Sequence, residues 1–262
     1  MKYTPKLPDT SVNVTKKNVL VESGKLLLVL GIIAVVLHFV MNFTLDYVVE
    51  HMTPKQEKKL ISFINLSPSM EDEKHDAYLQ SITDKLAKCA NLPYKIETFL
   101  IDTPERNAFA MPSGKIYITK GMLKEIENEN ELINVIGHEL GHFKHKDHLK
   151  GLGNSLILAT MSLFLEGKYG ALFGGSLKLS QAKYSQKAEH DADSFGLEVM
   201  SCAYGNVASA TSLFTRMDDG KKWEYFLETH PAFSSRVAQM KSKIQKEGYV
   251  TSAKVNALKQ KY

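Results

Sequence analysis

The sequence contains only two cysteines, Cys89 and Cys202, and they are not in a CxxC spacing. We therefore do not expect them to bind metal. One disulfide and two buried thiols both fit this count, so the cysteines leave the redox compartment open. The sequence also lacks a zinc-finger or RNA-binding motif, and its net charge of +4 comes from lysines spread along the chain. These absences predict no nucleic-acid partner.

Arginine is absent from the first 24 residues, which are polar and contain two prolines. This composition predicts a flexible tail over residues 1–24 rather than a mitochondrial presequence. Residues 26–43 are almost entirely apolar, and the apolar character continues to Val48. That length is enough to cross a bilayer, and no small-residue cleavage site follows it, which disfavours a cleaved signal peptide. The sequence predicts a single membrane anchor over residues 25–49 that contacts lipid through residues 26–48.

Lysines flank this apolar run unequally, with five before it and three within a similar distance after it. Because lysine and arginine are enriched on the cytoplasmic side of membrane spans, the asymmetry favours a cytoplasmic N-terminus. Residues 50–262 would then form a domain in a periplasm-like space.

Residues 138–142 read His-Glu-Leu-Gly-His, an H-E-x-x-H motif that follows an apolar helical pattern. Residues four apart lie on one helix face, so His138 and His142 can present two imidazole nitrogens to one metal ion. Glu139 would lie where its carboxylate reaches a metal-bound water and acts as a general base. The alternative is a helix with two incidental surface histidines. Gly137 and Gly141 would let another element approach this helix closely.

A catalytic zinc needs a third protein ligand and an open position for water. Residues 177–202 predict a long helix on which Glu189 and Asp193 share one face. Glu189 is the best candidate for the third ligand, and Asp193 could orient a ligand histidine through its other ring nitrogen. The alternative is a pair of exposed helix carboxylates.

The remaining patterns predict a mainly α fold with a small β-hairpin or sheet, of the α+β class. Thr53 and Gln56 predict a capping box for a helix reaching about Asn65. A second helix is expected over 71–90, a strand over 95–101, and further helices near 205–217 and after His230. Strands near 107–111 and 115–119 predict a hairpin, whose outer strand either pairs with an extended substrate or is purely structural. The apolar run over 152–165 fits a core helix, a membrane-dipping element or a flap.

Four segments, in this order, resemble the gluzincin family of CAAX prenyl proteases and HtpX-like membrane proteases (metallopeptidase family 48): NAFAMPSGKIYITKGML, HELGH, AEHDAD and THPAFSSR. The likeness covers roughly residues 90–245. Prenyl proteases have many membrane spans and this chain has one clear span. It is therefore more similar to the single-anchor and periplasmic quality-control members.

The resemblance implies a zincin-like domain with one zinc ion per chain. His138, His142 and Glu189 match the metal ligands, Glu139 the general base, and Asp193 the aspartate of an E-x-x-x-D signature. Catalytic roles are implied for His230 and Arg236, which match the family's H-P-x(4)-R element. In relatives this histidine stabilises the transition state or occupies the open zinc position in a resting form. The hairpin implies substrate contacts at Asn107, Ala108, Phe109 and Ala110.

The expected function is therefore that of a membrane-anchored zinc metalloendopeptidase that hydrolyses misfolded or damaged envelope proteins. Its expected location is a bacterial inner membrane, with the catalytic domain on the periplasmic side. The alternative is a latent or pseudo-protease that binds envelope proteins as a chaperone does. The physiological substrate, the oligomeric state and the pairing of Cys89 with Cys202 stay open at this point.

Overall fold

A computed structural model describes residues 18–63, 72–93, 95–151, 153, 184–217, 223–230, 233–259 and 262. The chain divides into two units, Met1–Tyr47 and Val48–Tyr262. The predicted tail lies mostly outside the described residues, as does the apolar run over 152–165 apart from Gly153.

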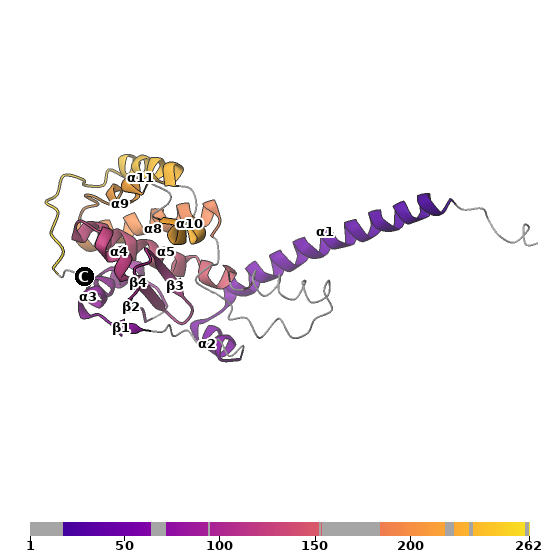
Figure 1. Cartoon of the computed structure of the whole chain (residues 1–262), viewed down its shortest axis with the longest axis horizontal. Coiled ribbons are helices and arrows are strands. Elements are labelled where there is room, and N and C mark those ends of the chain that lie inside the picture. The colour runs from indigo at the N-terminus through magenta and orange to yellow at the C-terminus, as the bar shows by residue number, and fades with distance from the viewer. Residues whose placement is uncertain are drawn as a thin grey trace, which may run out of the picture. The chain divides into compact units, whose positions relative to one another are not determined.

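The first unit contains most of helix α1 (Val19–His51), which is long and apolar enough to cross a membrane. Figure 1 shows α1 as one uninterrupted helix, which begins before the predicted start of the anchor at residue 25. Asn18 caps it by accepting a hydrogen bond from the backbone N–H of Leu20 at 3.1 Å. None of the most apolar stretch is buried, which disfavours a core helix because such a helix would pack against its own protein.

A four-stranded mixed sheet with the order β1-β2-β4-β3 lies in the second unit. Its strands are β1 (Glu73–His75), β2 (Glu97–Ile101), β3 (Ala108–Met111) and β4 (Lys115–Thr119). Strands β2 and β4 are parallel, and the other two pairs are antiparallel. The predicted strand and hairpin are confirmed. The hairpin turn has left-handed backbone at Ser113 and Gly114, and β3 forms one end of the sheet.

The helices of the second unit are α2 (Pro54–Phe63), α3 (Ala77–Ala90), α4 (Lys120–Glu125), α5 (Glu129–Lys144), α8 (Gln186–Tyr204), α9 (Ser212–Arg216), α10 (Glu224–Thr229) and α11 (Phe233–Glu247). The predicted capping box of α2 is present, since Gln56 accepts from the backbone N–H of Thr53 at 2.8 Å and Thr53 accepts from that of Gln56 at 3.3 Å.

Three predicted helix boundaries were wrong. The helix expected from residue 71 begins at Ala77, because Asp76 caps it and the residues before it pair with β2. Of the helix expected over 177–202, residues 177–183 lie outside the described residues, and helix α8 begins at Gln186, where Ser185 is the N-cap. It runs to Tyr204 and ends at Gly205, whose φ of 70° is left-handed. The helix expected near 205–217 is therefore only the short α9.

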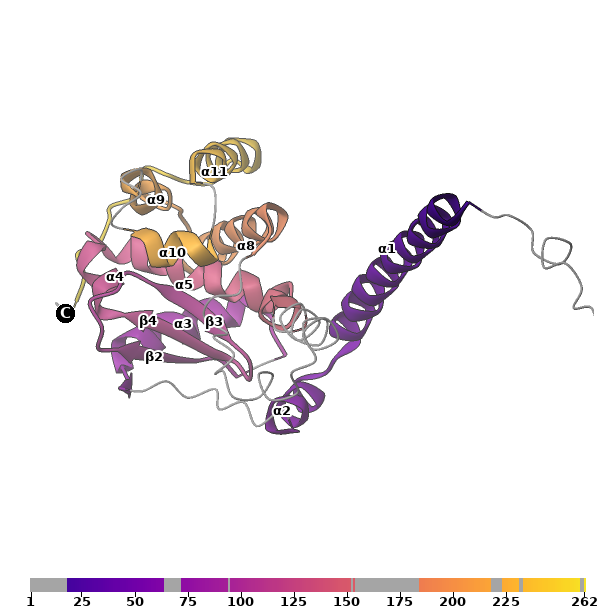
Figure 2. The same cartoon turned by 45° about the vertical axis from the view of Figure 1, so that its right-hand side comes forward.

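Helix α5 packs against β3 and α8, and α3 packs against β2, α5 and α8 (Figure 2). Glycines allow α5 and α8 to approach closely, as the sequence predicted. A Cβ on Gly141 would lie 2.6 Å from the Cα of Ala192, and one on Gly137 would lie 3.1 Å from the carbonyl oxygen of Gly196. This close packing brings the H-E-x-x-H segment beside the first turns of α8.

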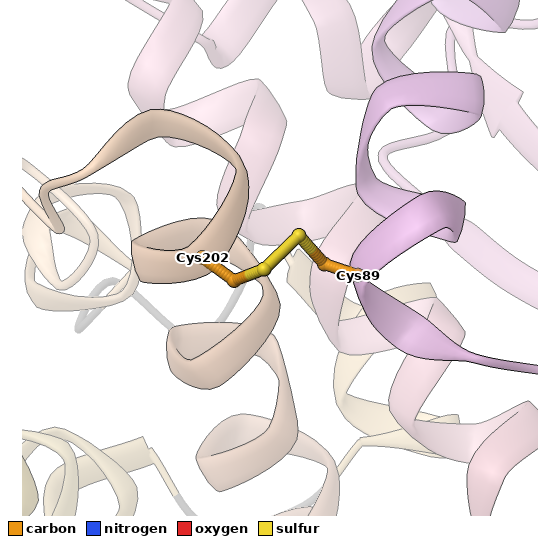
Figure 3. The surroundings of a disulfide bond; sticks show 2 residues. All are labelled: Cys89 and Cys202. Carbon is orange, nitrogen blue, oxygen red and sulfur yellow. A yellow bond between two sulfur atoms is a disulfide. The ribbon is translucent and has the colours of Figure 1, made fainter.

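A disulfide joins Cys89 on α3 to Cys202 on α8 (Figure 3). Of the two states that fitted the cysteine count, the structure has the disulfide, and the alternative of two buried thiols is wrong. The bond ties the distal end of α8 to α3, and α3 in turn packs against β2 and α5.

Candidate metal centre

Four side chains from three parts of the chain converge in the second unit: His138 and His142 from α5, Glu189 from α8, and His230 at the C-terminal end of α10. One ligand atom from each lies within 4.8 Å of the others, and all four residues are buried. The Nε2 atoms of His138 and His142 are 3.1 Å apart, and each is 3.6–3.7 Å from a carboxylate oxygen of Glu189. Zinc ligands at about 2.0–2.1 Å in a tetrahedron are themselves separated by about 3.4 Å, so these spacings fit such an ion.

The hydrogen bonds of His138 and His142 also indicate a metal site. The Nδ1 atom of His138 lies 2.9 Å from Asp193, and that of His142 lies 3.0 Å from Asp147. A carboxylate accepts, so each Nδ1 carries the proton and each Nε2 presents a lone pair. Two lone pairs facing each other at 3.1 Å repel unless a cation lies between them. The donor set therefore fits a metal ion.

The surroundings of His138 and Glu189 keep both side chains in the protonation states that metal binding requires. Burial, reinforced by the positive charge of Arg236, lowers the pKa of His138 to about 4, so the imidazole is neutral. Burial alone would raise the pKa of Glu189, but the nearby His230 and Arg236 outweigh it and lower that pKa to about 2. Neutral imidazoles and an ionised carboxylate are the forms that coordinate zinc.

Arg236 is a fully buried cation on α11 that binds carboxylates beside the ligands. Its Nε and Nη2 atoms each donate to Asp193 at 2.7 Å, and its Nη1 atom lies 2.6 Å from Glu189. Burial would raise the pKa of Asp193, but Arg236 lowers it strongly below the usual aspartate value. A fork of this kind fixes the position of both carboxylates.

Glu139 lies beside the cluster with its carboxylate fully buried. Among the described residues, no side chain hydrogen-bonds to either of its oxygens. Burial raises its pKa to about 7, although His142 and the backbone N–H of Ala110 in β3 both act to lower it. A buried carboxylate with such a pKa can accept and release a proton near neutral pH.

His230 faces two groups of the cluster. Its Nδ1 atom lies 3.0 Å from Glu189 and 3.3 Å from Nε2 of His138. Its Nε2 atom lies 3.9 Å from Glu139. The ring stacks on Phe226, and His230 belongs to the group of four residues that could hold a metal ion.

The proposed substrate strand borders the centre through its backbone. Strand β3 packs against α5, and the Ala110 N–H faces Glu139. The side chains of Asn107, Ala108, Phe109 and Ala110 are buried in this structure. The exposed fraction of each residue includes its backbone, so substrate contacts at these four residues stay a prediction.

Sequence reasoning missed two residues of the centre. Asp147, which contacts His142, follows the end of α5 in a turn where Lys146 has left-handed backbone, so no helical spacing indicated it. Its only signal was a carboxylate shortly after the motif. Tyr184 stacks on His142 with ring centroids 3.9 Å apart, and burial raises the pKa of its phenol well above the usual value.

The family model described as Peptidase family M48 matches residues 73–244. The chain belongs to peptidase family M48. The match contains every residue of the metal centre described above.

Curated relatives carry protease names, most of them metalloprotease or metalloendopeptidase names. The chain is 31% identical over 157 residues to "Mitochondrial metalloendopeptidase OMA1" of Schizosaccharomyces pombe, which covers 56% of this chain and 46% of the relative. It is 25% identical over 155 residues to "Metalloprotease LoiP" of Escherichia coli, and the match covers 54% of this chain and 60% of that relative. It is 24% identical over 200 residues to the "Putative beta-barrel assembly-enhancing protease" of Vibrio cholerae, and the match covers 68% of this chain and 41% of that relative. The matched parts of the OMA1 relatives span about a third to a half of their length.

Proposed function

We propose that this protein is a membrane-anchored zinc metalloendopeptidase that cleaves unfolded or damaged membrane and envelope proteins. One observation carries the proposal. The lone pairs of His138 and His142 converge with the Glu189 carboxylate next to Glu139, a buried carboxylate with no side-chain hydrogen bond among the described residues. Membership of family M48 and the metalloendopeptidase names of the relatives support it.

His138, His142 and Glu189 would hold one zinc ion. Zinc supplies Lewis-acid chemistry, polarising water and the carbonyl oxygen of a peptide bond. Asp193 and Asp147 orient the two histidines through their Nδ1 atoms. Such partners raise the basicity of the ligands and fix their tautomers.

Glu139 acts as the general base and acid. One of its carboxylate oxygens takes a proton from the attacking water and then delivers that proton to the nitrogen of the leaving amine. Its raised pKa of about 7 suits both transfers. The N–H of Ala110 beside it belongs to an edge strand, whose backbone would align an extended peptide across the site.

His230 and Arg236 have different roles in this proposal. Arg236 would hold Glu189 and Asp193 in place through its ion pairs. Nδ1 of His230 lies 3.0 Å from Glu189 and 3.3 Å from Nε2 of His138, so it would be close enough to take the fourth ligand position in a resting form. On activation the ring would turn away and stabilise the oxyanion formed from the peptide carbonyl.

Helix α1 would anchor the protein in a bilayer, with the second unit in an oxidising space such as the periplasm. The lysine asymmetry around the apolar run supports a cytoplasmic N-terminus, and the Cys89–Cys202 disulfide supports an oxidising compartment. Protease treatment of right-side-out vesicles tests this topology. We expect the C-terminal unit to be digested, and its protection would contradict the orientation.

Glu139→Gln tests the activity directly in the full-length protein. The variant should keep its zinc, measured by atomic absorption, and lose cleavage of fluorescent casein by at least about a thousand-fold. Retained cleavage would refute the general-base role. Glu189→Ala should lose zinc, and unchanged zinc content would remove Glu189 from the ligand set. If the wild-type protein binds zinc and unfolded protein but never cleaves it, the alternative of a latent or pseudo-protease that binds proteins as a chaperone does is supported.

A further inference from the structure

Glu57 is a buried carboxylate on α2, the short helix that follows α1 in the chain. The other charged residues of α2, Lys55, Lys58 and Lys59, are exposed, whereas Glu57 is 0% exposed. Burying a carboxylate is costly unless the group is paired or hydrogen-bonded. Its contacts therefore indicate what the side chain stabilises.

Two contacts lead from Glu57 toward the metal centre. Its Oε1 atom accepts a hydrogen bond from the backbone N–H of Ser113 at 2.6 Å. The same oxygen lies 3.4 Å from Nε2 of His148, and Nδ1 of His148 lies 3.4 Å from the carbonyl oxygen of His142. One carboxylate thus reaches both the turn of the β3–β4 hairpin and a histidine that contacts the last turn of α5.

The hairpin turn needs support from outside. Ser113 has a φ of 70°, a left-handed conformation that is unfavourable for a residue with a Cβ atom. Next to it, the carbonyl oxygen of Gly114 accepts from the N–H of Glu97 at 2.8 Å, which ties the turn to the start of β2. Glu57 holds the other side of the turn through a charge-assisted hydrogen bond. Strand β3 ends at Met111, shortly before Ser113. The position of the turn therefore constrains the position of β3.

We infer that Glu57 is a positioning residue for the substrate edge. By holding Ser113, it sets the position of β3 and of the Ala110 N–H relative to Glu139. It does not touch substrate or metal and acts through the hairpin. The inference rests on the proposed peptidase function, because it takes β3 as the strand that aligns the peptide.

The test compares Glu57→Leu and Glu57→Gln in the full-length, zinc-loaded protein. Leucine removes the acceptor, and glutamine keeps a neutral acceptor of similar reach. We expect the KM for fluorescent casein to rise about ten-fold in Glu57→Leu and less in Glu57→Gln. That is the size of effect that a lost hydrogen bond to a charged group produces. Zinc content should be unchanged, and kcat should stay within about two-fold because the ligands and Glu139 are intact.

A second measurement does not depend on cleavage. In a Glu139→Gln background, hydrogen exchange of the peptide covering residues 108–119 should be about ten-fold faster with Glu57→Leu than without it. Ile61→Ala is the matched control, since Ile61 lies four residues further along the same buried face of α2 and is 3% exposed. It should weaken the packing of α2 and leave both KM and the exchange of the hairpin near wild type.

The outcomes separate the two proposals. Unchanged KM and unchanged hairpin exchange in Glu57→Leu would overturn the inference. Equal effects from Ile61→Ala would also overturn it, because the docking of α2 would then be the cause. If the wild-type protein binds zinc but does not cleave casein, the latent alternative to the proposed function is supported, and the exchange comparison still decides the role of Glu57.

Discussion

Replacing Gly141 with alanine tests whether the close approach of α5 and α8 builds the metal centre. A Cβ at this position would lie 2.6 Å from the Cα and 2.8 Å from the carbonyl oxygen of Ala192. Both are backbone atoms, so no side-chain rotation relieves the clash. An ordinary carbon–carbon contact needs about 3.5 Å, and α8 must therefore retreat by about 1 Å.

That retreat acts on the metal site because Glu189 lies one helical turn before Ala192. Ligand distances in a metal site tolerate deviations of only about 0.2 Å. We expect Gly141→Ala to weaken zinc binding by at least about ten-fold. The effect on stability is smaller, because alanine favours the helix by about 1 kcal/mol while overpacking costs about 1–3 kcal/mol. The net loss without zinc should be about 0–2 kcal/mol.

The assay is competition for zinc against a chelating indicator, with thermal melting recorded with and without zinc. Gly137→Ala is the matched control one turn earlier, where the nearest atoms are at 3.1 Å and 3.2 Å and a shift of a few tenths of an ångström suffices. It should bind zinc within about three-fold of wild type. If Gly141→Ala melts higher than wild type and binds zinc equally well, helix propensity dominates and the close packing is not required.

Three further predictions follow from the same structure. Asp147→Asn should lower zinc affinity by about 10–100-fold, because it removes the carboxylate that orients His142. The same competition assay checks this, with Asp191→Asn on α8 as a control that should leave affinity unchanged. Replacing Cys89 and Cys202 together by serine should destabilise the protein by about 4–5 kcal/mol in urea unfolding, since the bond closes a loop of 113 residues; a loss below about 1 kcal/mol would contradict the entropic estimate. Removing zinc with a chelator should lower the melting temperature. Free zinc at a hundred times its Kd should raise the free energy of unfolding by about 2.7 kcal/mol, and a melting temperature insensitive to zinc would argue against a site specific to the folded state.

The parts of the fold that could be predicted are those that depend on residues close together in the sequence. The capping box at Thr53 and Gln56, the hairpin turn at Ser113 and Gly114, and the apolar run of α1 all follow from local backbone chemistry. Strand β1 was missed because its three residues have no strand pattern of their own. They become a strand only by pairing with β2. For the same reason, the start of α3 was placed too early.

The residues of the candidate centre also differ in whether local spacing could predict them. His138, Glu139 and His142 lie within five residues on one helix, so their spacing sufficed to propose a metal site. The helix position of Glu189 was not sufficient to predict its role. It became the candidate because a catalytic zinc needs a third protein ligand. Asp147 lies in an irregular turn, and no periodicity marks it.

The sequence by itself determined which side chains can bind metal and which helical faces carry them, because those properties depend on residue type and short-range geometry. Only the tertiary structure decided their environment. It buried Glu139 and raised its pKa, and it placed Arg236 on Glu189 and Asp193. It also directed His230 toward the cluster and joined Cys89 to Cys202. Each of these depends on residues tens of positions apart meeting in the folded chain. For Glu139, Glu189, Asp193, His230 and Arg236 the meeting place is a buried, low-dielectric interior, where charge interactions are strong enough to set protonation and position.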